Sequence, residues 1–211
     1  MPHSMSGIYA TYWESVYPDE VSGVIFIDSI NEADKAEEMP AIANVYFKIG
    51  QFLGKAGVAR VVTDIMGGTS EDVYGDYQKD AEALAGVRVT GASNSYHLEL
   101  ENFPANMKTA WDSIEANDIP KVYISTNFQS VDDAKEYLIY VYGEADEEEA
   151  KRRYENELSD EQKDYRQNRS KYIEKLGNCK KINTSGSHFI YEQKPEECAK
   201  VISDFIDNTR T

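Results

Sequence analysis

The chain opens with the residues Pro2-His3-Ser4-Met5-Ser6-Gly7, and this stretch decides the fold. Apolar residues then recur at helical spacing from Ile8 to Tyr17, where Pro18 stops the pattern. The residues at 21–27 form a run of the kind found in buried strands, which ends at Asp28. The opening therefore predicts a tight turn around Ser4, then a helix, then a strand.

The rest of the chain continues this alternation. Further strands are predicted at 121–125 and 180–183, and helices at 131–142 and from Pro195 onward. Strands that alternate with helices usually pair in parallel and are covered by helices on both faces. We therefore predict an α/β fold built on a parallel sheet.

Two regions depart from the alternation. Between 31 and 118 the pattern favours helices at about 43–53, 71–84 and 95–114. The charge-dense stretch at 146–175 contains many opposite charges four residues apart, which predicts one long solvated helix or a helical hairpin.

The composition narrows the class of function. The chain has 211 residues and a formal net charge of -16, which disfavours binding to nucleic acids or anionic membranes. Cys179 and Cys198 are too few for a disulfide framework, and they stand outside any zinc-binding spacing. No run is apolar enough for a transmembrane helix, and no signal peptide is visible. We expect a small-molecule substrate and neither metal nor cofactor, whereas the compartment and oligomeric state are not encoded in these patterns.

The opening turn resembles the nucleophile elbow of the α/β-hydrolase family, in which small residues flank a serine between a strand and a helix. Ser6 meets this need and Gly7 adds space, whereas Pro2 replaces the usual glycine. A second motif, residues 185–197 around His188, resembles the loop after the family's last strand and the start of the terminal helix.

The resemblance implies roles for three groups. Ser4 would be the nucleophile, His188 would accept its proton, and the amide of Met5 would form half of the oxyanion hole. The alternative for His188 is an ordinary loop histidine. His3 occupies a position where the family often has a non-catalytic histidine, and His97 is expected to be a surface or packing residue.

The family's catalytic triad also contains a carboxylate that contacts the histidine, and the sequence defines this residue less well. The usual family position falls near Gln129, and an amide cannot take the role. Some members of the family place the acid after the strand that follows the elbow helix, which here gives Asp28. Asp132 and Asp133 are alternative acids, although both also suit the N-terminal cap of the helix at 131–142.

The resemblance covers nearly the whole chain but only the C-terminal half of the family's fold. It implies a partial hydrolase core at 1–30 and 119–211, with a helical cap or lid inserted at 31–118. The earlier strands and the second oxyanion donor are expected upstream, in a longer reading frame rather than in a degenerate gene. The implied function is a serine hydrolase acting on an ester, thioester or amide; the alternative is an inactive truncated fragment or a hydrolase-like binding module.

Overall fold

The computed structural model describes residues 1–30, 45, 48–49, 52–53, 56 and 98–209. The chain divides into one compact unit at Met1–Lys35 and Met107–Thr211 and a second at Ala36–Asn106. Most of the predicted cap at 31–118, including the helices expected at 43–53 and 71–84, lies outside the described residues. The helix predicted at 95–114 is helical at 98–113, the part that is described.

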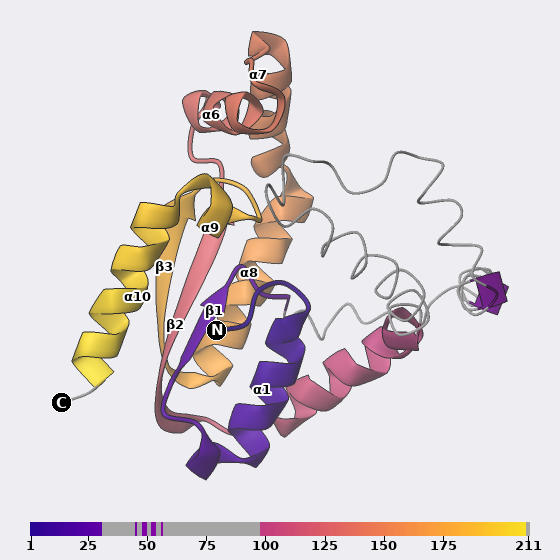
Figure 1. Ribbon diagram of the computed structural model, residues 1–211, viewed down its shortest axis with the longest axis vertical. Helices are drawn as coiled ribbons and strands as arrows, with labels where there is room; N and C mark the ends of the chain where they lie inside the picture. Colours follow the sequence, from indigo (N-terminus) through magenta and orange to yellow (C-terminus); the bar gives the residue numbers. More distant parts are fainter. Residues whose placement is uncertain (31–44, 46–47, 50–51, 54–55, 57–97, 210–211) are drawn as a thin grey trace, which may run out of the picture. The chain divides into compact units, whose positions relative to one another are not determined.

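The first unit contains a parallel sheet of three strands in the order β1-β2-β3 (Figure 1). The strands are β1 (Val24–Ile27), β2 (Asn117–Asn127) and β3 (Gly177–Ser185). All three predicted strands are confirmed, and β2 and β3 extend beyond the predicted ends. The prediction of an α/β fold with a parallel sheet is therefore confirmed.

The N-terminal residues run alongside the free edge of β1. His3 forms a parallel bridge with Ile27. The amide of Ile27 donates to the carbonyl of Pro2 at 2.9 Å, and the amide of Ser4 donates to the carbonyl of Ile27 at 3.4 Å. The turn at Ser4 is thereby tied to the carboxyl end of β1.

Helices cover both faces of this sheet. Their bounds are α1 (Ser6–Val16), the 3-10 helix η1 (Pro18–Glu20), α6 (Val131–Tyr142), α7 (Glu147–Glu157), α8 (Asp160–Lys175), α9 (Ile190–Gln193) and α10 (Pro195–Thr209). Figure 1 shows α10 on one side of the sheet and α1 with α8 on the other. The predicted helix at 131–142 has the observed bounds of α6, and the helix predicted from Pro195 is confirmed as α10.

The two faces follow from the alternation of side chains along each strand. On one face, the core consists of Val24, Phe26, Ile114, Tyr123, Tyr172, Ile173 and Leu176. On the other face, it consists of Ile25, Ile27, Val122, Ile124, Ile190 and Cys198, with partly buried residues of α10 packed against it. Because β1 and the middle of β2 are buried on both faces, their sequences are almost continuous apolar runs, whereas the edge strand β3 is partly exposed and largely polar.

The stretch at 146–175 corrects one prediction. It forms two helices, α7 and α8, and the side chain of Ser159 caps the second by accepting from the amide of Gln162. The prediction of a solvated element is wrong for α8, because this helix buries Arg169, Tyr172 and Ile173. The many charges on its outer face concealed a narrow apolar stripe near its C-terminal end.

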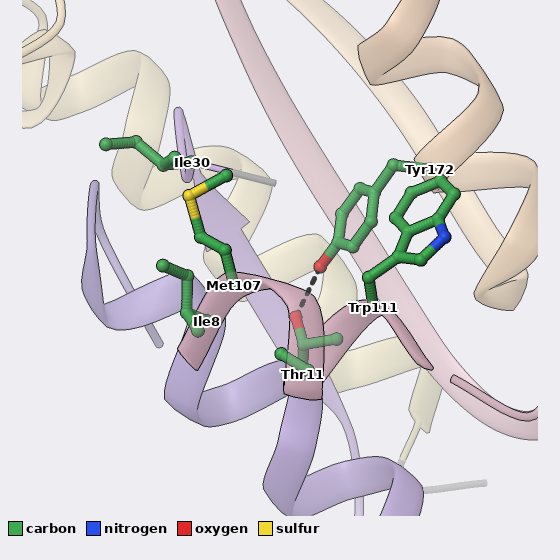
Figure 2. A pocket seen from close by; sticks show the side chains of 7 residues that line it. Ile8, Thr11, Ile30, Met107, Trp111 and Tyr172 are labelled. Atoms are coloured by element: carbon green, nitrogen blue, oxygen red, sulfur yellow. Dashed lines mark hydrogen bonds between the residues drawn. The ribbon is translucent and has the colours of Figure 1, made fainter. Parts of the chain in front are cut away.

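A small cavity lies where α1 and α8 meet residues 107–111 (Figure 2). Its volume is about 10 Å³, and Ile8, Met107 and Trp111 contribute to its wall. The hydroxyls of Thr11 and Tyr172 are hydrogen-bonded beside it at 2.5 Å. The space is about that of one water molecule, so this cavity does not accommodate an organic substrate.

Candidate functional site

Ser4 lies in a turn whose backbone is strained. Its φ is 53°, in the left-handed region that residues with a side chain rarely adopt. The carbonyl of Ser4 accepts hydrogen bonds from the amides of Gly7 and Ile30, each at 3.0 Å. This geometry is that of a sharp strand-to-helix turn, as the sequence predicts.

The small residue that this turn requires is Gly7 rather than Ser6. A Cβ atom on Gly7 would lie 2.4 Å from the Cβ of Ser29, so helix α1 approaches the end of β1 too closely for any side chain there. Ser6 is exposed, and its hydroxyl donates to the carbonyl of His3 at 2.6 Å. The expectation that Ser6 provides the space is therefore wrong; Ser6 closes the turn by a hydrogen bond.

Asp28 follows β1 directly, at the carboxyl edge of the sheet. Its φ is 38°, its amide donates to the carbonyl of Ile124 at 2.8 Å, and the residue is 7% exposed. The amide of Thr126 donates to its Oδ1 at 3.2 Å. The carboxylate is thus held by the backbone of the neighbouring strand.

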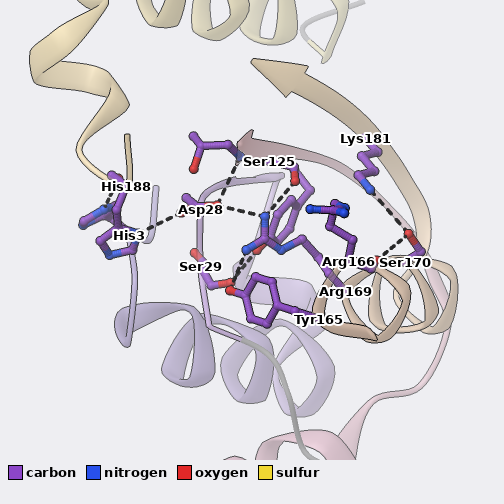
Figure 3. A network of polar contacts seen from close by, with 12 residues as sticks. His3, Asp28, Ser29, Ser125, Tyr165, Arg166, Arg169, Ser170, Lys181 and His188 are labelled. Atoms are coloured by element: carbon purple, nitrogen blue, oxygen red, sulfur yellow. Dashed lines mark hydrogen bonds and ion pairs between the residues drawn. The ribbon is translucent and has the colours of Figure 1, made fainter. Parts of the chain in front are cut away.

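His188 lies in the loop between β3 and α9 and contacts Asp28. The distance from His188 Nδ1 to Asp28 Oδ2 is 2.8 Å, across 160 positions of sequence (Figure 3). An ionised carboxylate only accepts hydrogen bonds, so Nδ1 carries the proton and a neutral imidazole has an acceptor at Nε2. This is the tautomer that a general base requires.

Asp28 is kept ionised by its surroundings. Burial raises the pKa of this carboxyl, but the hydrogen bond from His188, the charge of Arg169 and the bond from Thr126 together hold the pKa below its usual value. The acceptor role of Asp28 toward His188 is therefore available at neutral pH.

His3 supports the loop that carries His188. Its Nε2–H donates to the backbone carbonyl of His188 at 2.9 Å, and the two ring centroids are 4.4 Å apart. The ring of His3 also contacts Phe189 and Tyr191. His3 therefore links the Ser4 turn to the His188 loop.

Arg169 is a residue of this site that the sequence motifs do not reveal. Its Nη1 lies 3.0 Å from Asp28 Oδ1, and the two side chains are 2% and 8% exposed. Figure 3 shows the guanidinium between Asp28, Ser125 and Tyr165. The available signal was the position of Arg169 three residues before Tyr172, one helical turn from the apolar stripe of α8.

The remaining predicted site residues lie as follows. Met5 precedes the first residue of α1, and its amide donates no hydrogen bond among the described residues. Asp133 accepts from the amide of Gln129 at 2.8 Å, and Asp132 lies 3.5 Å from Lys135. Both acids belong to the first turn of α6, and the carboxylate at His188 belongs to Asp28.

The structure does not connect every member of the predicted triad. Ser4 and Asp28 both lie at the carboxyl end of β1, and Asp28 contacts His188. Within the described residues, no hydrogen bond joins the hydroxyl of Ser4 to His188. Such bonds are often long in free enzymes and shorten when a substrate binds.

Other parts of the first unit are less suited to chemistry. Burial raises the pKa of Cys179 to about 12, so its thiolate is scarce at neutral pH. A cavity of about 250 Å³ between β2, β3 and α10 is lined by residues that include Lys121 and Phe205, at the end of the sheet opposite Asp28.

The described part of the chain contains no cluster of three His, Cys, Asp or Glu residues suited to a metal ion. None of the described helices is both long and apolar enough to cross a membrane.

No family model and no curated protein matches the sequence. Among solved structures, a crystal structure of DBJA is similar at 14% identity and a TM-score of 0.49, over 99% of this chain and 67% of that one. A probable hydrolytic enzyme from Pseudomonas aeruginosa is similar at 13% identity and a TM-score of 0.43, over 96% of this chain and 61% of that one. The α/β fold is shown by the chain's own parallel sheet, which helices cover on both faces.

Proposed function

We propose that the chain is a serine hydrolase of the α/β-hydrolase type, acting on an ester, thioester or amide of a small organic acid. The observation that carries the proposal is the 2.8 Å contact between His188 Nδ1 and Asp28 Oδ2 beside the strained turn of Ser4. These three residues come from separate parts of the sequence. A histidine, a buried carboxylate and a strained serine that lie together at the carboxyl end of a strand are the kind of cluster found at active sites.

The proposed reaction assigns one task to each group. Ser4 Oγ attacks the acyl carbonyl while His188 Nε2 takes its proton, and Asp28 stabilises the imidazolium that forms. The amide of Met5 donates to the oxyanion of the tetrahedral intermediate. When the intermediate collapses, His188 returns the proton to the leaving group and an acyl group remains on Ser4. Water, activated by the same histidine, then releases the acid.

The rival function is a hydrolase-like binding module, or an inactive fragment. The missing hydrogen bond between Ser4 and His188 among the described residues favours it. The two functions differ in whether the Ser4 hydroxyl becomes nucleophilic, and this can be measured directly.

The test is covalent labelling of the folded chain with a fluorophosphonate, read by intact mass and peptide mapping. We expect one adduct, on Ser4, that is lost in Ser4→Ala and strongly slowed in His188→Gln. Ser203→Ala is the control, since Ser203 is an exposed serine of α10 and should leave the rate unchanged. A monodisperse, folded sample without an adduct, or an adduct that persists in Ser4→Ala, would reject the hydrolase.

A further inference from the structure

We propose that Arg169 is a positioning residue for the Asp28–His188 pair: it fixes the Asp28 carboxylate and weakens its hold on a protonated His188. The inference rests on the proposed function for the role of His188 as base. Helix α8, which the sequence predicts to be a solvated element, would then contribute a residue to the site.

The two carboxylate oxygens of Asp28 contact different side chains. Asp28 Oδ2 accepts from His188, whereas Oδ1 lies 3.0 Å from Arg169 Nη1 and also accepts from the amide of Thr126. Both oxygens are therefore engaged, and the plane of the carboxylate is fixed. Because Arg169 and Asp28 are almost completely buried, water screens their interaction little.

Arg169 is itself held in place from several directions. Nη1 donates to Ser125 Oγ at 2.7 Å and Nη2 to the hydroxyl of Tyr165 at 2.5 Å. The guanidinium lies 4.4 Å from the ring centroid of Tyr165 and 5.6 Å from that of Tyr123. These contacts hold the planar guanidinium in one orientation relative to Asp28. The ammonium group of a lysine would carry the same charge but could not make the same set of contacts.

The consequence for proton transfer follows from the charge. A carboxylate that is already paired with a cation stabilises an adjacent imidazolium less than a lone carboxylate does. Arg169 therefore favours the neutral form of His188, the form that accepts a proton from Ser4. Removing the charge at position 169 should extend the protonated form of His188 to higher pH.

The other ionisable groups around the pair define the electrostatic background. They are Tyr123 on β2, Tyr165 and Arg166 on α8, Glu157 at the end of α7, and His3 on the N-terminal segment. Arg166 Nη1 lies 3.3 Å from Glu157 Oε2. Arg166 is thus a matched control: a cation on the same helix, three residues from Arg169, that pairs with a different carboxylate.

The experiment uses two readouts on the full chain. One is the pH profile of fluorophosphonate labelling at Ser4, and the other is the pH titration of the imidazole nitrogens of His188, followed by NMR. The variants are Arg169→Gln, Arg169→Lys, the double variant Ser125→Ala/Tyr165→Phe, and Arg166→Gln. Circular dichroism establishes that each variant is folded.

For Arg169→Gln we expect the acid limb of the labelling profile and the imidazole titration to move to higher pH by about 0.5–1 unit. A charge in direct contact with the titrating group shifts it by about 1–3 units, and Arg169 acts through Asp28. The plateau labelling rate should fall about 10-fold because the carboxylate is less well oriented. Arg169→Lys should restore most of the pH shift but less of the rate, and Arg166→Gln should change neither appreciably.

Two results would overturn the inference. One is an unchanged imidazole titration in a folded Arg169→Gln chain; the other is an equal shift in Arg166→Gln, which would indicate a general effect of net charge. If Arg169→Gln does not fold, the double variant decides: a smaller shift in the same direction supports the role, and no shift rejects it. If Ser4 is never labelled, the hydrolase proposal fails, while the imidazole titration still decides the inference.

Discussion

Ser4 and Asp28 are the non-glycine residues with positive φ in the described part of the chain, at 53° and 38°. Backbone strain of this kind costs on the order of 1–3 kcal/mol per residue and persists where the surrounding structure enforces it. Here both positions lie at the carboxyl end of β1, where backbone hydrogen bonds to Ile27 and Ile124 hold them. The strain thus coincides with the site that the contact between Asp28 and His188 indicates.

Replacing Asp28 with asparagine should separate its two roles. Labelling of Ser4 should slow by about 10³–10⁴-fold, since asparagine favours the wrong imidazole tautomer. Unfolding in urea should show a loss of about 3–5 kcal/mol, because Arg169 becomes a buried charge without a carboxylate partner. Asp132→Asn is the control, since Asp132 is exposed on α6. If Asp132→Asn slows labelling more than Asp28→Asn, the acid has been assigned to the wrong residue.

The stability that Asp28 contributes should depend on pH in a defined direction. Its pKa is lower in the folded chain than in the unfolded chain, so the contribution is complete above the usual aspartate range. It should be lost as the pH falls below about 4, through the lowered pKa of the folded state. The measurement is the difference in urea midpoint between the wild-type chain and Asp28→Asn at several pH values. A difference that grows toward acid would contradict the sign.

At the scale of elements, the close approach of α1 to the end of β1 can be tested at Gly7. Gly7→Ala should destabilise the chain by about 1–3 kcal/mol, because the new methyl group would overlap the Cβ of Ser29. Combining it with Ser29→Gly removes that Cβ and should recover part of the loss, relative to Ser29→Gly alone. Combining it with Ser29→Ala keeps the Cβ and should recover none. Equal recovery in both backgrounds would mean that another atom limits the approach.

The elements also show what the sequence could reveal. Continuous apolar runs identified β1 and β2, and apolar residues at helical spacing identified α6, because burial leaves local signals. The residue that caps α6 is Ser130, rather than Asp132 or Asp133, which the sequence offered. The pairing of His188 with the position of Asp28 was predicted from a resemblance between motifs rather than from spacing. Arg169 was missed because a single buried cation among exposed charges leaves no periodic signal. The importance of Gly7 was missed for a similar reason: the neighbour that restricts it, Ser29, lies on another element.

At the scale of the whole molecule, the charges that are buried within the described residues balance one another. The chain has 38 acidic and 22 basic residues, yet Lys121 and Arg169 are buried in the first unit, each within reach of a buried carboxylate. Lys121 Nζ lies 3.4 Å from Glu14 Oε2, and both side chains are fully buried. Among the described residues, the buried charges are therefore compensated, and the excess of acidic groups lies at positions that are at least partly exposed.

This distribution predicts how the stability of the chain responds to salt. Exposed ion pairs on α7 and α8, such as Lys151–Glu148 and Lys163–Asp160, contribute little to stability, and salt weakens them. Salt also weakens the mutual repulsion of the excess acidic groups, which extends about 30 Å at 0.01 M and about 8 Å at 0.15 M. Because the net charge is -16, we expect the second effect to prevail, with a gain on the order of 1 kcal/mol between these concentrations.

Urea unfolding at the two salt concentrations measures this balance, with Glu174→Gln as the informative variant. Glu174 is exposed in the last turn of α8, where the helix dipole also disfavours a negative charge, so removing its charge reduces the repulsion without disturbing the core. The variant should be more stable than the wild-type chain at low salt and should gain less from added salt. A chain that loses stability as salt rises would show that the surface ion pairs outweigh the repulsion. In that case the excess acidic charge has little effect on the free energy of unfolding. The buried ion pairs of Arg169 and Lys121 would then be the main electrostatic contribution to the fold, because salt screens buried pairs poorly.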